Sequence, residues 1–209
     1  MSWSPGKSLV MTVLLSGCLS PTSGTSDSSW PAGPNAVSLL GGEVVIDAPA
    51  GYCLDPSATQ TDPPAMTVFF AACGPGYPHV AMSAVVAEGR TPGILKPEGV
   101  EALSRYFSTE RGRTSLSRAG KAENVTVHAT EIGEEIVVLH LSDTSRTAKV
   151  GIAPSYFRAV TELNGHLVTF SVLPFNDLGM PDSTVRDLLD RLVEASRVAS
   201  EPANAEEAG

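Results

Sequence analysis

The chain has 209 residues, with 14 Lys and Arg against 23 Asp and Glu and a formal net charge of −9. This balance excludes the strongly basic surface that is typical of nucleic-acid-binding proteins. Between two polar ends lie about 160 residues, which is enough for one domain with a hydrophobic core.

The first residues have the layout of an export signal. Lys7 is the only charged side chain before a short apolar run at residues 9–15, in which Thr12 is the one polar residue. A membrane-spanning helix needs about 20 apolar residues, so this run is too short to be one. A charged start followed by a short apolar run is typical of a secretory signal.

The sequence Leu15-Ser16-Gly17-Cys18 closes this segment. It resembles the lipobox of bacterial lipoproteins, and the resemblance implies that residues 1–17 are removed and that Cys18 carries a diacylglyceryl group. Two acyl chains anchor a protein stably, since each buried methylene contributes about 0.8 kcal/mol. The alternative is a plain signal with an incidental cysteine. Leu19, rather than the Asp that signals inner-membrane retention in some Gram-negative cells, favours the outer membrane.

Residues 18–36 are predicted to be a lipidated cysteine followed by a flexible tether. The segment is rich in Ser, Thr, Pro and Gly, and Trp30 is its only aromatic residue. Such a composition cannot bury enough apolar surface to fold alone, and its length would hold a domain about 20–25 Å from the anchor. Residues 37–199 are predicted to form a single domain, and residues 200–209 a disordered acidic tail.

If Cys18 carries lipid, Cys53 and Cys73 remain as an even pair in an exported protein. Export favours a disulfide between them, with Cα atoms roughly 4.4–6.8 Å apart. The bridge would close a loop of about 20 residues and contribute roughly 3 kcal/mol of stability. Two buried free thiols are the alternative. Neither cysteine belongs to a zinc pattern, and no metal site is predicted.

The first half of the domain predicts three strands and a helix. Residues 44–48 alternate, residues 66–72 form a nearly continuous apolar run, and residues 80–87 follow a Pro- and Gly-rich break. Residues 98–111 place Val100, Leu103 and Phe107 at helical spacing. Residues 113–116 are predicted as a short edge strand.

Residues 125–130 and 135–142 predict a hairpin with Gly133-Glu134 as a type II′ turn. In this register His128 and His140 point to opposite faces of the sheet. That placement argues against a shared metal site and favours ordinary sheet histidines. His79 is expected to be exposed, and His166 to lie at the rim of the domain.

The clearest local signal is a second hairpin around Asn164-Gly165, the preferred pair for a type I′ turn. The turn aligns four pairs on one largely apolar face: Leu163 with His166, Thr161 with Val168, Ala159 with Phe170, and Phe157 with Val172. A helix follows at residues 180–196, with Asp182 or Ser183 as its N-cap. Its predicted buried stripe consists of Val185, Leu188, Leu189 and Leu192.

The fold class is therefore α+β, an antiparallel β-sheet flanked by helices. An exported lipoprotein whose YFRAVTELNGHLVTFSV hairpin leads into a C-terminal amphipathic helix resembles the PsbP-like architecture, including DcrB-type envelope lipoproteins. The resemblance extends over residues 44–199. It implies an α/β/α sandwich and a non-enzymatic accessory role, and it supplies no functional residues.

No catalytic motif is present: the sequence has neither a Gly-x-Ser-x-Gly elbow nor a His-Glu-x-x-His pair. No catalytic residue or cofactor is predicted. Most of the positively charged residues in the middle of the chain lie between Arg90 and Lys121. They form either a basic face for an acidic partner or ordinary solvated surface.

The predicted function is a non-enzymatic envelope lipoprotein that acts as an interaction or assembly module. It would be held to the membrane by lipid on Cys18 and would bind an envelope protein partner. The alternative is a carrier of a small apolar ligand or lipid, with a pocket between sheet and helix. A cleft that holds His beside a carboxylate would favour an enzyme instead.

Overall fold

The computed structural model describes residues 34–145, 151–175 and 179–201. Its helices are α1 (Pro97–Ser108), α2 (Glu110–Leu116) and α3 (Asp182–Ser200). Its strands are β1 (Ala36–Leu39), β2 (Val44–Asp47), β3 (Tyr52–Leu54), β4 (Ala65–Ala72), β5 (Val80–Arg90), β6 (Val125–Gly133), β7 (Ile136–Asp143), β8 (Ser155–Leu163) and β9 (His166–Pro174). Short 3-10 turns precede β2 and β6.

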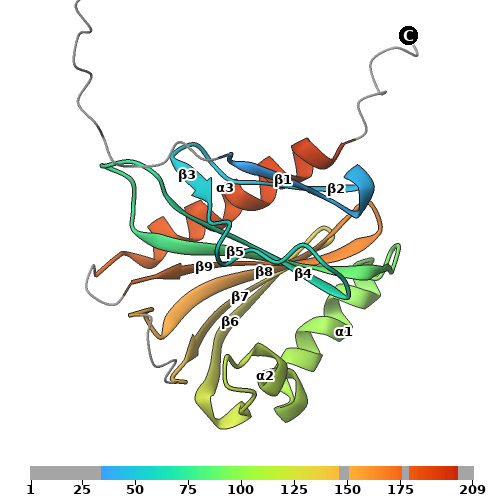
Figure 1. Cartoon of the computed structure of the whole chain (residues 1–209). Coiled ribbons are helices and arrows are strands. Elements are labelled where there is room, and N and C mark those ends of the chain that lie inside the picture. Colours follow the sequence, from blue (N-terminus) through green and yellow to red (C-terminus); the bar gives the residue numbers. More distant parts are fainter. Residues whose placement is uncertain (1–33, 146–150, 176–178, 202–209) are drawn as a thin grey trace, which may run out of the picture.

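Seven strands form one antiparallel sheet in the order β3-β4-β5-β9-β8-β7-β6, and β1 and β2 form a separate hairpin. Helix α3 and the β1-β2 hairpin lie on one side of the sheet, while α1 and α2 lie on the other (Figure 1). The fold is α+β with helices on both sides of an antiparallel sheet, as predicted.

The Asn164-Gly165 hairpin has the predicted turn and register. Asn164 and Gly165 have φ values of 49° and 83°, the positive values that a type I′ turn requires. Phe170 pairs with Ala159, and both are fully buried against α3 residues such as Leu188. The hairpin and α3 therefore meet in a packed core, as predicted from the inward face of one and the apolar stripe of the other.

A second core lies on the other side of the sheet, under α1 and α2. It combines helix residues such as Val100 and Phe107 with sheet residues such as Leu139 and Tyr156. All four side chains are at least nine-tenths buried. The two cores share the sheet because alternate residues of each strand point to opposite faces.

The prediction for residues 98–116 was wrong in two respects. The first helix ends at Ser108, and residues 113–116 form the end of α2 rather than a strand. The Thr109 hydroxyl caps α2 by accepting the Gly112 N–H at 3.0 Å. Only glycine fits at position 112, because a Cβ atom there would lie 2.0 Å from the Tyr106 carbonyl oxygen. The missing side chain at Gly112 thus allows α2 to pack closely against the end of α1.

The β6-β7 hairpin exists, but its predicted turn was wrong by one residue. Gly133 pairs with Ile136, so Glu134 and Glu135 form the turn, and Glu135 has a φ of 56°. The Thr161 hydroxyl donates to the Glu135 carbonyl at 2.9 Å and fixes this turn against β8. A bulge between Val127 and Ala129 shifts the register a second time.

Two smaller details also differ from the predictions. The N-cap of α3 is Pro181, which provides no side-chain hydrogen bond, rather than Asp182 or Ser183. Strands β1 and β3, of four and three residues, were not predicted. The stripe of Val185, Leu188, Leu189 and Leu192 is buried as predicted.

Candidate interaction surfaces

The lipobox and Cys18 lie outside the described residues, so lipidation stays a prediction. The described chain begins at Pro34, whose carbonyl accepts the Leu54 N–H at 2.9 Å. Asn35 donates to Asp47 at 3.0 Å. The chain thus enters the domain on the side of β1, β2 and α3, away from α1 and α2 (Figure 1). No helix in the described ranges is long and apolar enough to cross a bilayer.

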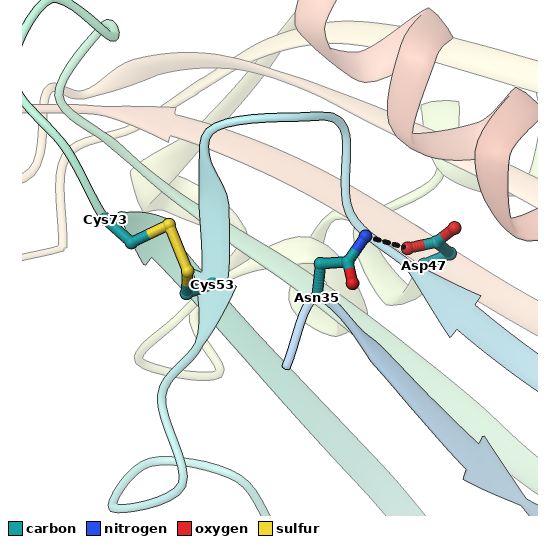
Figure 2. The surroundings of a disulfide bond; sticks show 4 residues. All are labelled: Asn35, Asp47, Cys53 and Cys73. Carbon is teal, nitrogen blue, oxygen red and sulfur yellow. Dashed lines mark hydrogen bonds between the residues drawn. A yellow bond between two sulfur atoms is a disulfide. The ribbon is translucent and has the colours of Figure 1, made fainter. Parts of the chain in front are cut away.

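Cys53 and Cys73 form a disulfide in the structure (Figure 2). Their Cα atoms are 5.5 Å apart, within the predicted range. Cys53 lies in β3 and Cys73 directly follows β4, so the bridge ties a three-residue edge strand to its neighbour. Its place at the end of two paired strands indicates a structural role.

The histidine prediction for β6 and β7 was wrong. The bulge and the shifted turn bring His128 and His140 to the same face, with ring centroids 5.2 Å apart. His140 stacks on Phe157 at 4.4 Å, and its Nε2 lies 2.9 Å from the Ser155 hydroxyl. Among the residues that the structure describes, no group of three or more His, Cys, Asp or Glu is placed to hold a metal ion.

His166 was expected at the rim, but its side chain is only 4% exposed. Its Nε2 lies 3.0 Å from Glu43 Oε2, and Arg90 lies 3.1 Å from the same oxygen. The hydrogen bond with His166 and the charge of Arg90 lower the pKa of Glu43. This His–carboxylate pair joins the start of β9 to the β1-β2 hairpin and borders none of the grooves described below. His79 is exposed, as predicted.

Three of the seven cations between Arg90 and Lys121 lie within 4.0 Å of a carboxylate. Arg90 pairs with Glu43 and Arg105 with Glu101. Arg118 pairs with the buried Asp143 at 3.2 Å. These three cations are neutralised locally, which indicates ordinary solvated surface at these three positions.

Asp143 is the most constrained carboxylate of the described chain, with a fully buried side chain. It accepts the backbone N–H groups of Arg118 at 2.6 Å and of Ser145 at 2.8 Å. Burial acts to raise its pKa, but these hydrogen bonds and the Arg118 charge outweigh burial and lower the pKa. The pair fixes the segment after α2 to the end of β7.

The sheet side that carries α1 and α2 is only partly covered. The helices pack on β6 and β7, whereas the same side of β4 and β5 presents five small or half-exposed residues. We call these five residues the open face: Thr67, Phe69, Ala71, Ser83 and Val85. Val85 is 38% exposed. An antiparallel sheet can leave one face in contact with water, and β4 and β5 do so on this side.

An apolar groove runs between α1 and β9. We call it the α1 groove; its lining consists of Ile94, Leu95, Gly99, Ala102, Leu103, Tyr106 and Leu167, and its volume is about 280 Å³. Ile94, at its mouth, is 45% exposed. Leu167 lies two residues from Thr169, which pairs with Val85. Two residues of a strand span about 7 Å, so the α1 groove adjoins the open face.

Two further grooves flank β6. One, of about 300 Å³, lies between the start of α1 and the β6-β7 turn and is bordered by Ile132 and Glu134. Ile132 is 50% exposed. The other, of about 460 Å³, follows the outer edge of β6 beside α2. His128 lines the second groove, and neither lining pairs a histidine with a carboxylate. The neighbouring His140 lies 3.5 Å from Asp182, but both of these residues are outside the two linings.

Comparisons with known proteins gave a similarity of fold only. A scan of protein-family models and a search of the curated proteins found no match. Among solved structures, cyanobacterial PsbP (CyanoP) from Synechocystis matches with a TM-score of 0.45 and 15% identity, covering 82% of this chain and 96% of that one. The Ran-binding protein Mog1p from Saccharomyces cerevisiae matches with a TM-score of 0.41 and 10% identity, covering 77% and 92%. At these TM-scores the likeness carries no functional inference.

Proposed function

We propose that this protein is a lipid-anchored lipoprotein of the bacterial cell envelope, with its domain facing the periplasm and no catalytic activity of its own. It acts as an interaction or assembly module that binds another envelope protein. The lipobox motif at Cys18 supports the anchor, and the Cys53–Cys73 bridge fits an oxidising compartment. Leu19 favours the outer membrane over the inner membrane.

The observation that carries the proposal is the apolar surface formed by the α1 groove and the open face. Ile94 in the α1 groove and Val85 on the open face are 45% and 38% exposed, and the groove is lined almost wholly by apolar residues. Apolar surface that is shared between a helix flank and an uncovered sheet is typical of a protein–protein contact. The groove suits an apolar anchor side chain of the partner, and the small residues of the open face allow close approach.

The alternative of a small-molecule carrier is less well supported. Ligand pockets enclose most of the ligand, whereas the α1 groove and the two grooves beside β6, of about 280, 300 and 460 Å³, are all open to solvent. The space between α3 and the sheet, where a carrier pocket was considered, is filled by Phe170, Leu188 and Leu189, each fully buried. A protein partner therefore fits the geometry better than a carried ligand does.

The anchor is tested with Cys18→Ala. The variant should leave the membrane fraction or remain unprocessed, because no acyl chains can be attached. If the variant were cleaved correctly and still sedimented with the membrane, the anchor would be disproved.

The docking surface is tested by placing a photo-reactive amino acid at position 94 or at position 198. Val198 is the matched control, since it is a 58% exposed aliphatic residue on α3, on the opposite side of the sheet. Irradiation of intact cells should give a defined cross-linked product from position 94 and none from position 198. Equal products from both positions would contradict the proposed docking surface.

A further inference from the structure

Strand β6 is a nine-residue edge of the sheet. Within the described ranges it pairs with β7 only. In an antiparallel edge strand, alternate residues direct their N–H and C=O groups away from the sheet. The outer side of β6 therefore offers a row of main-chain donors and acceptors to a further strand.

The opposite edge of the sheet is closed by the chain itself. Strand β3 has three residues and bonds to Pro34 on its outer side. Beyond β3, Asp55 N–H donates to the Phe69 carbonyl at 2.8 Å, and Gln60 and Thr67 exchange two hydrogen bonds of 2.7 Å. The domain thus protects one edge with loop and disulfide and leaves the longer edge uncovered.

The free edge of β6 borders the largest of the three grooves described above, which we call the edge groove. Its volume is about 460 Å³, and its lining consists of Phe107, Ser108, Arg113, Val125, Thr126, Val127, His128, Ala129 and Thr130. Six of these residues are consecutive in β6, so the groove runs along the strand. The end of α1 and the start of α2 form its wall, which leaves room for one extended chain beside β6.

Arg113 gives this groove its charge. Its Nη1 donates to the Ser108 carbonyl at 2.7 Å, which orients the guanidinium. In the part of the chain that the structure describes, no carboxylate lies within 4.0 Å of Arg113, whereas Arg105 and Arg118 each have one. An oriented guanidinium with free donors is complementary to a carboxylate.

We propose that the edge groove binds an extended segment of a partner polypeptide, which adds to β6 as an eighth strand and places an acidic side chain against Arg113. Main-chain hydrogen bonds along the edge supply affinity in this mode of recognition, and side chains supply specificity. The β-bulge at Val127–Ala129 makes the edge irregular. Irregular edges hinder indiscriminate strand pairing, so the bulge favours a matched partner over aggregation. This site is distinct from the α1 groove and does not depend on it.

The test uses the full-length protein in detergent micelles and a capped nine-residue peptide in which Val alternates with Glu. The same peptide with Lys in place of Glu is the control. At about 0.15 M salt, which screens the long-range field of the net charge of −9, the Glu peptide should bind at least 10-fold more tightly than the Lys peptide, because only the former pairs with Arg113. Binding should also slow hydrogen exchange of the amides at residues 125–130 and leave those of β3 unchanged.

Variants of the two α2 arginines separate charge from folding. Arg113→Glu should reverse the preference between the peptides, and Arg113→Gln should abolish it without adding negative charge. Arg111→Glu makes the same change in net charge at an exposed residue outside the groove lining, and should leave the preference intact. Equal binding of the two peptides, absence of Glu-peptide binding, or exchange that slows elsewhere would overturn the proposal. Slow exchange at residues 125–130 without peptide, in a protein that sediments as a dimer, would assign the edge to a second copy and also overturn it.

Discussion

The two faces of the seven-stranded sheet differ in how completely they are covered. On one face, α3 and the β1-β2 hairpin bury Phe170 and Leu188 completely. On the other face, α1 and α2 cover β6 and β7, while Val85 on β5 and Ile94 beside α1 remain more than a third exposed. Both faces carry a packed core, but only the second leaves apolar side chains exposed beside it, and these are the ones we propose for binding. The predictions below test this division.

The largest effect is expected at the closed face. Phe170→Ala removes a fully buried ring and should cost about 3–5 kcal/mol in the free energy of unfolding. Phe69→Ala, which removes a half-buried ring from the open face, is the matched control and should cost clearly less. Denaturant unfolding of both variants measures the difference. A loss below about 1 kcal/mol for Phe170→Ala would mean that the closed face is not tightly packed.

The disulfide should have the next largest effect. Replacing Cys53 and Cys73 together with Ala opens a loop with a sequence separation of 20, and should cost roughly 3 kcal/mol through the gain in unfolded-chain entropy. Unfolding with and without a reducing agent measures the effect: the reductant should destabilise the wild type and leave the variant unchanged.

Asp143 provides a pH test of the helix-covered half of the second face. Its pKa is lowered in the folded state, so its stabilisation is present above its unfolded pKa of about 3.9 and is lost as the pH falls through its folded pKa. Asp143→Asn should cost about 1.5–3 kcal/mol at pH 7, as expected for hydrogen bonds to a charged group. The variant should also lose less stability than the wild type between pH 5 and pH 2. Parallel acid-unfolding curves for the two proteins would disprove this role.

The smallest change in stability is expected at the exposed aliphatic residues. Ile94→Asp and Val198→Asp each place a carboxylate at a residue that is 45% or 58% exposed. Surface substitutions of this kind usually alter the free energy of unfolding by about 0.5 kcal/mol or less. The melting temperatures of both variants should lie close to that of the wild type. A large loss for Ile94→Asp alone would mean that Ile94 is part of the core.

The sequence predicted the closed face better than the other one. The Asn164-Gly165 turn fixed a register that placed each inward side chain correctly, since an error of one residue would have moved them all to the other face. Around α1 and α2 the prediction failed, because the corner at Gly112 depends on close approach to Tyr106 rather than on local propensity. The bulge beside His128 and the turn at Glu135 are likewise set by contacts with neighbouring strands.

The candidate surfaces were less accessible to sequence analysis than the core. Ile94 lies in the turn before α1 and Val85 in β5. The pairing of β5 with β9 brings Val85 close to the α1 groove, which Ile94 lines. The free edge of β6 follows from the strand order, which local patterns do not specify. Single exposed aliphatic residues are common on protein surfaces. The sequence positions of Ile94 and Val85 therefore did not indicate that they belong to one apolar surface.

The division between the two faces is tested most directly by the size of the complex that the protein forms in its native envelope. Membranes that carry wild type, Ile94→Asp or Val198→Asp are extracted in mild detergent, and the protein is followed by size-exclusion chromatography. Wild type and Val198→Asp should elute together in a complex larger than the single chain, whereas Ile94→Asp should elute as the single chain. Co-elution of Ile94→Asp with the wild type, or loss of the complex in Val198→Asp, would contradict the account.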